Sequence, residues 1–280
     1  MKIAVSLFQR NNSRHLIEYF AWYKMLGVDT YLVYDHMSTD NSYEIIKKLS
    51  KFHDIRHLQI PGRNAGNEYW GHMFNHRSSG EFDWIVSADA DEFYLPIDHD
   101  NLKDVLLPYM DKKLSCLGIY WAMYGNNGHL NWEPGLVTEC FTRRAHLNNK
   151  LCYHIKSILR GGPEGGNIWY RNDGHRLITE HGTYDVYGRP IFNGLNYPGT
   201  ITHDILRINH YWAKSLEFFK TVKQVVGQRS DRPAGAPGEE ITEEFWWSQN
   251  FNDVEDDLAY SKFNKDLKYW YNIMKEQVES

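Results

Sequence analysis

The fold of this chain is decided by the stretch Trp84-Ile85-Val86-Ser87-Ala88-Asp89-Ala90-Asp91-Glu92-Phe93. Its apolar first part has high strand propensity, and three carboxylates follow directly. We therefore expect the carboxylates at the carboxyl end of a buried strand, which is the edge of an open α/β sheet where ligands bind. If the chain stays extended there, Asp89 and Asp91 point to one side, roughly 6 to 7 Å apart.

The charge of this stretch favours a cation site. Carboxylates this close repel one another unless a cation lies among them. A pair of carboxylates also suits a hard divalent ion that carries a phosphate ligand. We therefore predict that Asp89 and Asp91 hold a metal ion or another cationic group. The alternative is that they only solvate a strand end, because an Asp-x-Asp motif is short.

The composition excludes some classes of protein. A chain of 280 residues suffices for one large domain with an ample core. The formal net charge is −5 and no basic patch is visible, so a nucleic-acid partner is not expected. Aromatic residues make up 15% of the chain, which suits stacking on sugar rings but also ordinary core packing.

The cysteines and the amino terminus indicate a reducing compartment. Cys116, Cys140 and Cys152 are odd in number and form no Cys-x-x-Cys pair, so neither a disulfide framework nor a zinc knuckle is predicted. The apolar run from Met1 to Phe8 is too short for a signal peptide or a membrane span. We expect a cytoplasmic protein without a transmembrane segment.

Strands and helices alternate over the first ninety residues. Apolar runs predict strands over 3–8, 28–34, 55–60 and 83–88, and helical patterns lie over 12–26, 41–49 and 68–78. We expect the first helix to be capped near Asn12 or Ser13, and the second by a capping box of Asn41 and Glu44. This alternation predicts a parallel, doubly wound sheet.

The pattern changes after Pro96. We expect a short helix over 101–110, β-rich sequence over 116–160, long loops over 161–198, a strand over 207–212 and a helix over 214–226. The predicted organisation is one domain over 1–228, with a nucleotide-binding half (1–96) and an acceptor-side half (97–228). A linker over 229–240 and a helical segment over 241–280 follow.

Asp35 ends the second predicted strand, on the same sheet edge as the later acidic pair. A carboxylate there can accept a hydrogen bond from a uracil N–H or a ribose hydroxyl, while the later pair holds a metal ion on a diphosphate. The alternative is that Asp35 caps a turn.

Several motifs in this order resemble one family. They are His15-Leu16-Ile17-Glu18-Tyr19, Tyr34-Asp35-His36-Met37-Ser38-Thr39-Asp40-Asn41-Ser42, Ala88-Asp89-Ala90-Asp91-Glu92-Phe93, Tyr120-Trp121-Ala122-Met123-Tyr124-Gly125-Asn126-Asn127-Gly128-His129, Lys156-Ser157-Ile158 and Ile208-Asn209-His210-Tyr211-Trp212-Ala213-Lys214-Ser215. Over residues 1 to 226 the chain resembles GT-A type glycosyltransferases, specifically family 92 and its relatives similar to family 2.

The resemblance implies a fold and an activity. The fold would be a GT-A, Rossmann-like mixed sheet, mostly parallel, with helices on both faces and a helical carboxyl-terminal segment. The enzyme would move a hexosyl or deoxyhexosyl group from a nucleotide-diphosphate sugar, expected to be a UDP-sugar, to a hydroxyl of a saccharide or glycoconjugate. Mn²⁺, or Mg²⁺, would be the cofactor, because mixed carboxylate and imidazole ligands favour Mn²⁺.

The resemblance also assigns residues. The metal ligands would be Asp89, Asp91 and His210. The donor would be bound by Phe8, Arg10, Asn11, Asp35, Arg63, Asp89, Lys156 and Lys214. The catalytic candidates are Asp91, Glu92 and Glu133, with Asp185 as a further carboxylate that could serve as the base if the enzyme inverts.

Three other classes of protein remain as alternatives. A phosphatase that forms an aspartyl-phosphate carries its acidic pair after the first strand, whereas here the pair follows the fourth. A nucleotidyltransferase that makes a nucleotide sugar would carry a glycine-rich loop after the first strand, and residues 9–13 contain no glycine. A non-catalytic carbohydrate-binding module would explain the aromatic residues but would leave Asp89, Asp91 and His210 without a role.

Overall fold

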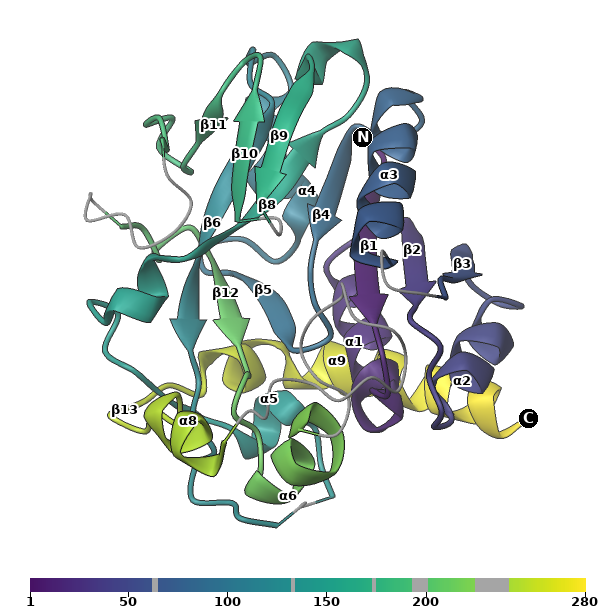
Figure 1. The fold of residues 1–280 in the computed structure, drawn as a ribbon, viewed down its shortest axis with the longest axis vertical. Coiled ribbons are helices and arrows are strands. Elements are labelled where there is room, and N and C mark those ends of the chain that lie inside the picture. The colour runs from purple at the N-terminus through teal and green to yellow at the C-terminus, as the bar shows by residue number, and fades with distance from the viewer. Residues whose placement is uncertain (62–64, 132–133, 173–174, 193–200, 225–241) are drawn as a thin grey trace.

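The structure is a computed structural model, and it describes residues 1–61, 65–131, 134–172, 175–192, 201–224 and 242–280 (Figure 1). The strands are β1 (Ile3–Gln9), β2 (Thr30–Asp35), β3 (Ile55–Gln59), β4 (Trp84–Ser87), β5 (Glu92–Pro96), β6 (Cys116–Met123), β7 (Arg143–Arg144), β8 (Ile155–Arg160), β9 (Ile168–Asn172), β10 (Arg176–Thr179), β11 (Thr183–Tyr184), β12 (Leu206–His210) and β13 (Val254–Glu255). The helices are α1 (Ser13–Met25), α2 (Ser42–Leu49), α3 (Ala65–Ser78), α4 (Leu102–Leu106), α5 (Val137–Cys140), α6 (Leu216–Phe218), α8 (Glu243–Ser248) and α9 (Leu258–Glu279). The short 3₁₀ helices are η1 (Leu107–Tyr109), η2 (Lys150–Tyr153) and η3 (Pro163–Gly165), and η4 (Phe219–Lys223) is a short π-helix.

One large sheet runs through the molecule in the order β3-β2-β1-β4-β8-β6-β12-β5, and β11 pairs with β6. Strands β1 to β4 pair in parallel, as do β6 with β12 and β6 with β11. Strand β8 runs antiparallel to β4 and β6, and β5 runs antiparallel to β12. The predicted mixed, mostly parallel sheet is therefore confirmed.

Helices cover both faces of the first strands. In β1, Ile3, Val5 and Leu7 pack into the cluster that α1, α2 and α9 share, whereas Ala4 packs into the cluster of α3. Side chains alternate between the faces of a strand, and all four of these are buried. This explains why the run reads as continuously apolar, since a strand covered on both faces has no polar side.

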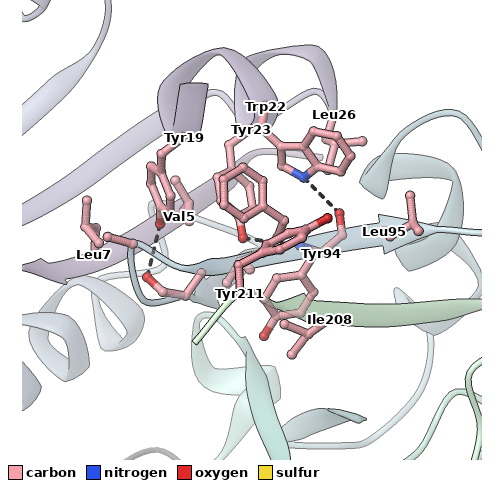
Figure 2. Packing of buried hydrophobic residues seen from close by; sticks show 14 of the residues in the cluster. Val5, Leu7, Tyr19, Trp22, Tyr23, Leu26, Tyr94, Leu95, Ile208 and Tyr211 are labelled. Carbon is pink, nitrogen blue, oxygen red and sulfur yellow. Dashed lines mark hydrogen bonds between the residues drawn. The ribbon is translucent and has the colours of Figure 1, made fainter. Parts of the chain in front are cut away.

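Three aromatic side chains of α1 hold the segment that carries the carboxylates (Figure 2). The hydroxyl of Tyr19 donates to Ala88 O at 3.1 Å, and that of Tyr23 donates to Glu92 O at 2.8 Å. The indole of Trp22 donates to Tyr94 O at 3.0 Å. These rings are fully buried, so each hydrogen bond satisfies a polar atom in the core and fixes the backbone around the acidic turn.

The helix caps differ from the prediction. Neither Asn12 nor Asn41 makes a side-chain cap to its helix. Instead Asp40 accepts from Ser13 N at 3.0 Å and from Ser42 N at 2.9 Å, so one carboxylate caps both α1 and α2. The predicted capping box is therefore wrong, because a tertiary contact between two helix starts supplies the acceptor that the local motif would have provided.

The second half also differs from the prediction. The expected loops over 161–198 contain the hairpin β9–β10 and the short strand β11, up to residue 192. The helix expected over 214–226 begins at Leu216 and continues as η4 to Lys223. The predicted linker over 229–240 lies outside the described residues. Helices α8 and α9 lie within 241–280, and α9 packs against α1 and α2. No helix among the described residues is long and apolar enough to cross a bilayer.

Candidate active site at the acidic turn

The acidic stretch forms a turn between β4 and β5, so the expected extended chain through Asp91 is wrong. Strand β4 ends at Ser87, and the amide of Ala88 still donates to Ser6 O at 3.1 Å. Glu92 N then donates back to Asp89 O at 3.0 Å, and this bond closes the turn. The side chain of Asp89 is 52% exposed and that of Asp91 only 14%, so the two carboxylates meet different surroundings.

Lys156 neutralises Asp89. Strand β8 pairs Ile158 with Val86 in antiparallel register, which brings Lys156 beside the turn. Its Nζ lies 2.7 Å from Asp89 Oδ2 and 3.5 Å from Glu92 Oε2. Burial opposes the charge on Lys156, but Asp89 and Glu92 outweigh it and raise the pKa of the ammonium. Lys156 is therefore a charged group held at the turn.

Glu92 is buried below Asp89 and has no exposed side-chain surface. Its Oε2 accepts from Asp89 N at 2.9 Å, whereas Oε1 has no hydrogen-bond partner. Burial raises the pKa of Glu92, and the nearby charge of Lys156 opposes this effect. In this arrangement Glu92 orients Asp89 and Lys156, and its catalytic role stays a prediction.

Lys223 and His210 surround Asp91. Lys223 Nζ lies 2.6 Å from Asp91 Oδ2, and His210 Nε2 lies 3.6 Å from Oδ1. Burial acts to raise the pKa of Asp91, but Lys223 and His210 lower it well below its usual range. Burial lowers the pKa of His210, against the opposing effect of Asp91. The site therefore combines a carboxylate with a neutral imidazole and an ammonium.

Lys214 lies buried near the same carboxylate. Its side chain has no exposed surface, its Nζ has no hydrogen-bond partner, and the ammonium lies 4.5 Å from the centre of the Phe218 ring. Burial lowers its pKa to about 7, while Asp91 opposes the shift. The backbone of Lys214 has φ +45°, a conformation that is costly outside glycine and tends to occur at functional sites.

The geometry accommodates a divalent ion in part. Asp91 Oδ1 and His210 Nε2 are 3.6 Å apart, a separation that two ligands of one ion can have when each bond is about 2.1 Å long. His210 Nδ1 is buried without a hydrogen-bond partner. Asp89 is turned toward Lys156, and the described residues contain no group of three or more His, Cys, Asp or Glu side chains arranged to hold a metal. Asp91 and His210 thus fit an ion as a pair.

The carboxyl ends of β1 and β2 bring the other predicted donor-binding residues together. Asp35 is fully buried and accepts at 2.5 Å from both Gln9 Nε2 and Ser38 Oγ. Asn11 donates from its backbone to Ser38 Oγ at 2.9 Å, with φ +55°. Phe8 stacks on the rings of His36 and Tyr69, and Arg10 Nε is buried without a hydrogen-bond partner.

Of three other candidates, Arg63 and Glu133 lie outside the described residues, and the structure places only Asp185, which it does not bring to the acidic turn. Asp185 is buried and accepts from the backbones of Tyr187 and Arg189, and its Oδ2 lies 2.6 Å from Arg189 Nε. These bonds close the turn between β11 and Pro190, so Asp185 has a structural role here.

The structure adds residues that the sequence did not indicate. Lys223 follows Lys214 by nine residues in a helical pattern, and nothing in that pattern separates it from a surface lysine. Trp121 lies at the end of β6, where its ring stacks on His154 at 5.0 Å and meets His210 at 4.2 Å. Trp121 lies in one of the motifs that carry the family resemblance, and this membership was the only sign in the sequence that it belongs to the site.

The chain matches the profile of a protein family described as glycosyltransferase family 92 over residues 3–160. A glycosyltransferase family 92 protein of Ricinus communis is 26% identical over 276 residues, covering 91% of this chain and 45% of that protein. Another from Oryza sativa subsp. japonica is 25% identical over 221 residues, covering 78% of this chain and 34% of that protein. The chain thus spans less than half the length of these relatives.

Solved structures show weaker likenesses. Residues 1–349 of TarS from S. aureus, in complex with UDP-GlcNAc, are 20% identical, with a TM-score of 0.36, over 57% of this chain and 45% of that chain. The mannosyltransferase PcManGT from Pyrobaculum calidifontis, in complex with GDP-Man and Mn²⁺, is 15% identical, with a TM-score of 0.32, over 42% of this chain and 35% of that chain.

Proposed function

The chain belongs to glycosyltransferase family 92, and from this premise we propose that it transfers a sugar from a UDP-sugar to a hydroxyl group of a saccharide or glycoconjugate. The observation that carries the proposal is the charge arrangement at the acidic turn. Asp89 and Asp91 are held beside Lys156, Lys223 and the buried Lys214. Such a mixture of anchored carboxylates and ammonium groups suits a ligand that brings its own cation and a diphosphate.

The reaction exchanges one bond at the anomeric carbon and transfers one proton. The acceptor oxygen bonds to the anomeric carbon, the bond from this carbon to the donor phosphate oxygen breaks, and the diphosphate leaves with the bonding electrons. The hydroxyl proton passes to a base, for which Glu92 and Glu133 are the candidates. Lys156, Lys214 and Lys223 would stabilise the negative charge that develops on the leaving diphosphate.

We propose Asp91 and His210 as the protein ligands of Mn²⁺ or Mg²⁺, with Asp89 reaching the ribose or a water molecule on the ion. When bound, the ion would supply Lewis-acid stabilisation of the diphosphate. The ion would take Asp91 Oδ1, the oxygen that faces His210, whereas Lys223 Nζ lies 2.6 Å from Oδ2. The positive charge of Lys223 would oppose a second cation on the same carboxylate, and the diphosphate would offset this repulsion.

The nucleoside would lie at the ends of β1 and β2. There the ring of Phe8 lies beside His36 and Tyr69, and the buried carboxylate of Asp35 accepts from Ser38 N at 3.0 Å and from Gln59 Nε2 at 3.4 Å. Gln9 and Ser38 already donate to Asp35, so they hold the carboxylate in one orientation. A uracil N–H or a ribose hydroxyl would replace one of the donors to Asp35, such as the more distant Gln59 Nε2, with a charge-assisted hydrogen bond.

Donor hydrolysis tests the proposal without knowledge of the acceptor. The purified protein is incubated with Mn²⁺ and with UDP-, GDP- and ADP-sugars in turn, and the released nucleoside diphosphate is measured. We expect release from at least one UDP-sugar. A nucleotidyltransferase would instead release pyrophosphate from a nucleoside triphosphate and a sugar phosphate, and a protein that consumes none of these substrates would contradict the proposal.

Calorimetry with UDP tests the nucleoside site. Asp35→Ala should weaken UDP binding by about 1.5 to 3 kcal/mol, the contribution of a lost charge-assisted hydrogen bond. Asp111→Ala removes a carboxylate that is 81% exposed and should leave UDP affinity unchanged. Equal affinity in the wild type and Asp35→Ala would restrict Asp35 to capping its turn.

A further inference from the structure

A pocket lies beside the loop that follows β6. It has a volume of about 510 Å³, within the roughly 300 to 1,000 Å³ of typical ligand pockets. Amide, apolar and arginine side chains line it: Asn126, Asn127, Gly128, Leu130, Arg143, Trp247, Asn250 and Asn252. None of these residues takes part in the acidic turn described above.

Hydrogen bonds and close backbone contacts join the two walls of this pocket. Asn126 N donates to Asn250 Oδ1 at 2.7 Å, and Asn127 N donates to Asn252 Oδ1 at 2.8 Å. A Cβ atom on Gly125 would meet the carbonyl oxygen of Phe251 at 2.1 Å, so only glycine allows the two segments to approach this closely. The pocket therefore has a fixed shape before any ligand binds, which lowers the cost of binding.

Two hydrogen bonds tie the pocket to the end of β12, which carries His210. Tyr124 N, just before the Asn-rich loop, donates to His210 O at 3.0 Å. On the other wall, the indole of the buried Trp246 donates to Ala213 O at 2.9 Å, and this bond fixes α8 and its neighbour Trp247. The walls of the pocket are thus anchored to the same segment that forms one side of the candidate active site.

The lining suits a ring that carries hydroxyl groups. The side chain of Trp247 is half-exposed and offers an aromatic face with low conformational freedom. A primary amide has two N–H donors and two lone pairs, so Asn127, which donates one N–H to Cys140 O, keeps further capacity. Asn250 donates one N–H to Asn126 Oδ1 and keeps the other, but its Oδ1 already accepts from Asn126 N and Asn252 Nδ2. Asn127 can therefore both donate to and accept from a hydroxyl group, Asn250 can donate to one, and Arg143 adds donors at the rim.

We propose that this pocket binds the saccharide that accepts the transferred sugar, an inference that rests on the proposed glycosyltransferase function. The occupant is a pyranose unit that packs its C–H face on Trp247 and hydrogen-bonds to Asn127 and Asn250. The pocket is thus a saccharide subsite, separate from the nucleoside edge at β1 and β2.

Saturation-transfer NMR with a panel of methyl pyranosides and disaccharides of the glucose, galactose, mannose and N-acetylglucosamine series tests this subsite. We expect at least one panel member to bind the wild type. Trp247→Ala should weaken that binding at least fivefold, whereas Trp247→Phe, which keeps an aromatic face, should weaken it by a factor of about two. Leu130→Ala is a second wall variant that should also weaken it, because the Leu130 side chain lines the pocket but is 49% exposed and contributes little to the core.

Tyr269→Ala is the matched control, since Tyr269 is an aromatic residue that is 60% exposed on α9 and does not line the pocket. UDP affinity, measured by calorimetry, should be unchanged in all four variants. Absence of binding across the panel, or binding that neither Trp247→Ala nor Leu130→Ala weakens, would overturn the subsite. Saccharide binding that depends on Trp247, in a protein that neither binds UDP nor hydrolyses a donor, would keep the subsite but refute the proposed function.

Discussion

At the scale of single residues, the surroundings of Asp91 decide what its removal should do. Its carboxylate lies between Lys223 and His210, and the buried Lys214 is coupled to it. Lysine side chains among the described residues therefore already relieve the repulsion between the carboxylates of the acidic turn, before any ion binds. The carboxylate stabilises the native structure as well as serving the proposed reaction.

We predict that Asp91→Asn lowers donor hydrolysis at least a hundredfold, because the variant loses the charged oxygen proposed to bind the ion. It should also lower the free energy of unfolding, by roughly 1 to 3 kcal/mol for a hydrogen-bonding partner left unsatisfied, since Lys223 then loses its counter-charge. Steady-state hydrolysis and urea unfolding measure the two effects. Asp111→Asn, at an exposed carboxylate, is the control for both. Hydrolysis at the wild-type rate would refute the metal-binding role of Asp91.

A second residue prediction concerns Lys223. Its ammonium lies 2.6 Å from Oδ2 of the carboxylate whose Oδ1 the proposed ion would take, so the positive charge of the lysine opposes the binding of a metal ion. Lys223→Met should therefore bind Mn²⁺ alone about tenfold more tightly, a gain of ~1.4 kcal/mol. Electron paramagnetic resonance of free Mn²⁺ measures this without a nucleotide.

Lys220→Met provides the control for Lys223→Met. Lys220 is half-exposed and lies 2.6 Å from Glu243 Oε2, in the same short helical region. Its loss should leave Mn²⁺ affinity unchanged. Weaker Mn²⁺ binding by Lys223→Met than by the wild type would show that the lysine supports the ion instead of competing with it.

At the scale of elements, one carboxylate connects the carboxyl-terminal segment to the sheet. Asp256 lies between β13 and α9 and bonds to Arg144 of β7 at 2.6 Å and to Arg207 of β12 at 2.8 Å. Burial acts to raise the pKa of Asp256, but the hydrogen bonds and charges of the two arginines outweigh it and lower the pKa to about 2. The ion pairs thus favour the folded state when Asp256 is ionised.

The sign of the pH effect follows from that shift. The folded pKa of about 2 lies below the ordinary value of 3.8, so Asp256 stabilises the protein above pH ~4 and this stability is lost as the pH falls toward 2. The shift corresponds to roughly 2 kcal/mol. Asp256→Asn should lower the free energy of unfolding by about that amount at pH 7, and by progressively less toward pH 2.

Urea unfolding as a function of pH measures the effect, with Glu255→Gln as the control. Glu255 is the adjacent residue, its side chain is 73% exposed, and it lies 3.4 Å from Arg143 Nη1, so its removal should change stability little. A pH profile of Asp256→Asn that runs parallel to that of the wild type down to pH 2 would mean that the arginines do not stabilise the ionised form.

At the scale of the whole molecule, the candidate site draws on segments far apart in the chain. The nucleoside edge comes from β1 and β2, the acidic turn from β4 and β5, and the lysines from β8 and η4. A ligand that bridges these elements binds only the folded chain, so it must stabilise the fold as a whole.

We therefore predict that UDP with Mn²⁺ raises the melting temperature. At a ligand concentration one hundred times the dissociation constant, the gain is about 2.7 kcal/mol. Differential scanning fluorimetry compares UDP, GDP and ADP, each with and without Mn²⁺. We expect the largest rise with UDP and Mn²⁺ together and a smaller one with either alone. An equal rise with Mn²⁺ alone and with the pair would mean that the nucleotide adds nothing.

The local patterns of the sequence determined the alternation of strands and helices in the first half. The apolar runs of β1, β2 and β4 and the helical stripe of α1 are set by which side chains must be buried, and neighbouring residues carry that information. The acidic stretch after β4 indicated the cation-rich edge for the same reason. That Asp35 lies at the same edge of the sheet followed from the rule that the carboxyl ends of parallel strands share an edge.

Only the tertiary structure decided which groups meet at that edge. Asp40 caps two helices, Lys223 reaches Asp91 across 132 residues, and Lys156 comes from a strand that runs antiparallel to β4. The hairpin β9–β10 was missed because apolar residues lie on both of its faces: Ile168 and Leu177 pack against the core, whereas Trp169 and Ile178 are exposed, so no alternation of apolar and polar residues marks it in the sequence. Burial periodicity is a property of neighbouring residues, whereas ion pairs and shared caps depend on segments that meet only when the chain has folded, and no local pattern records them.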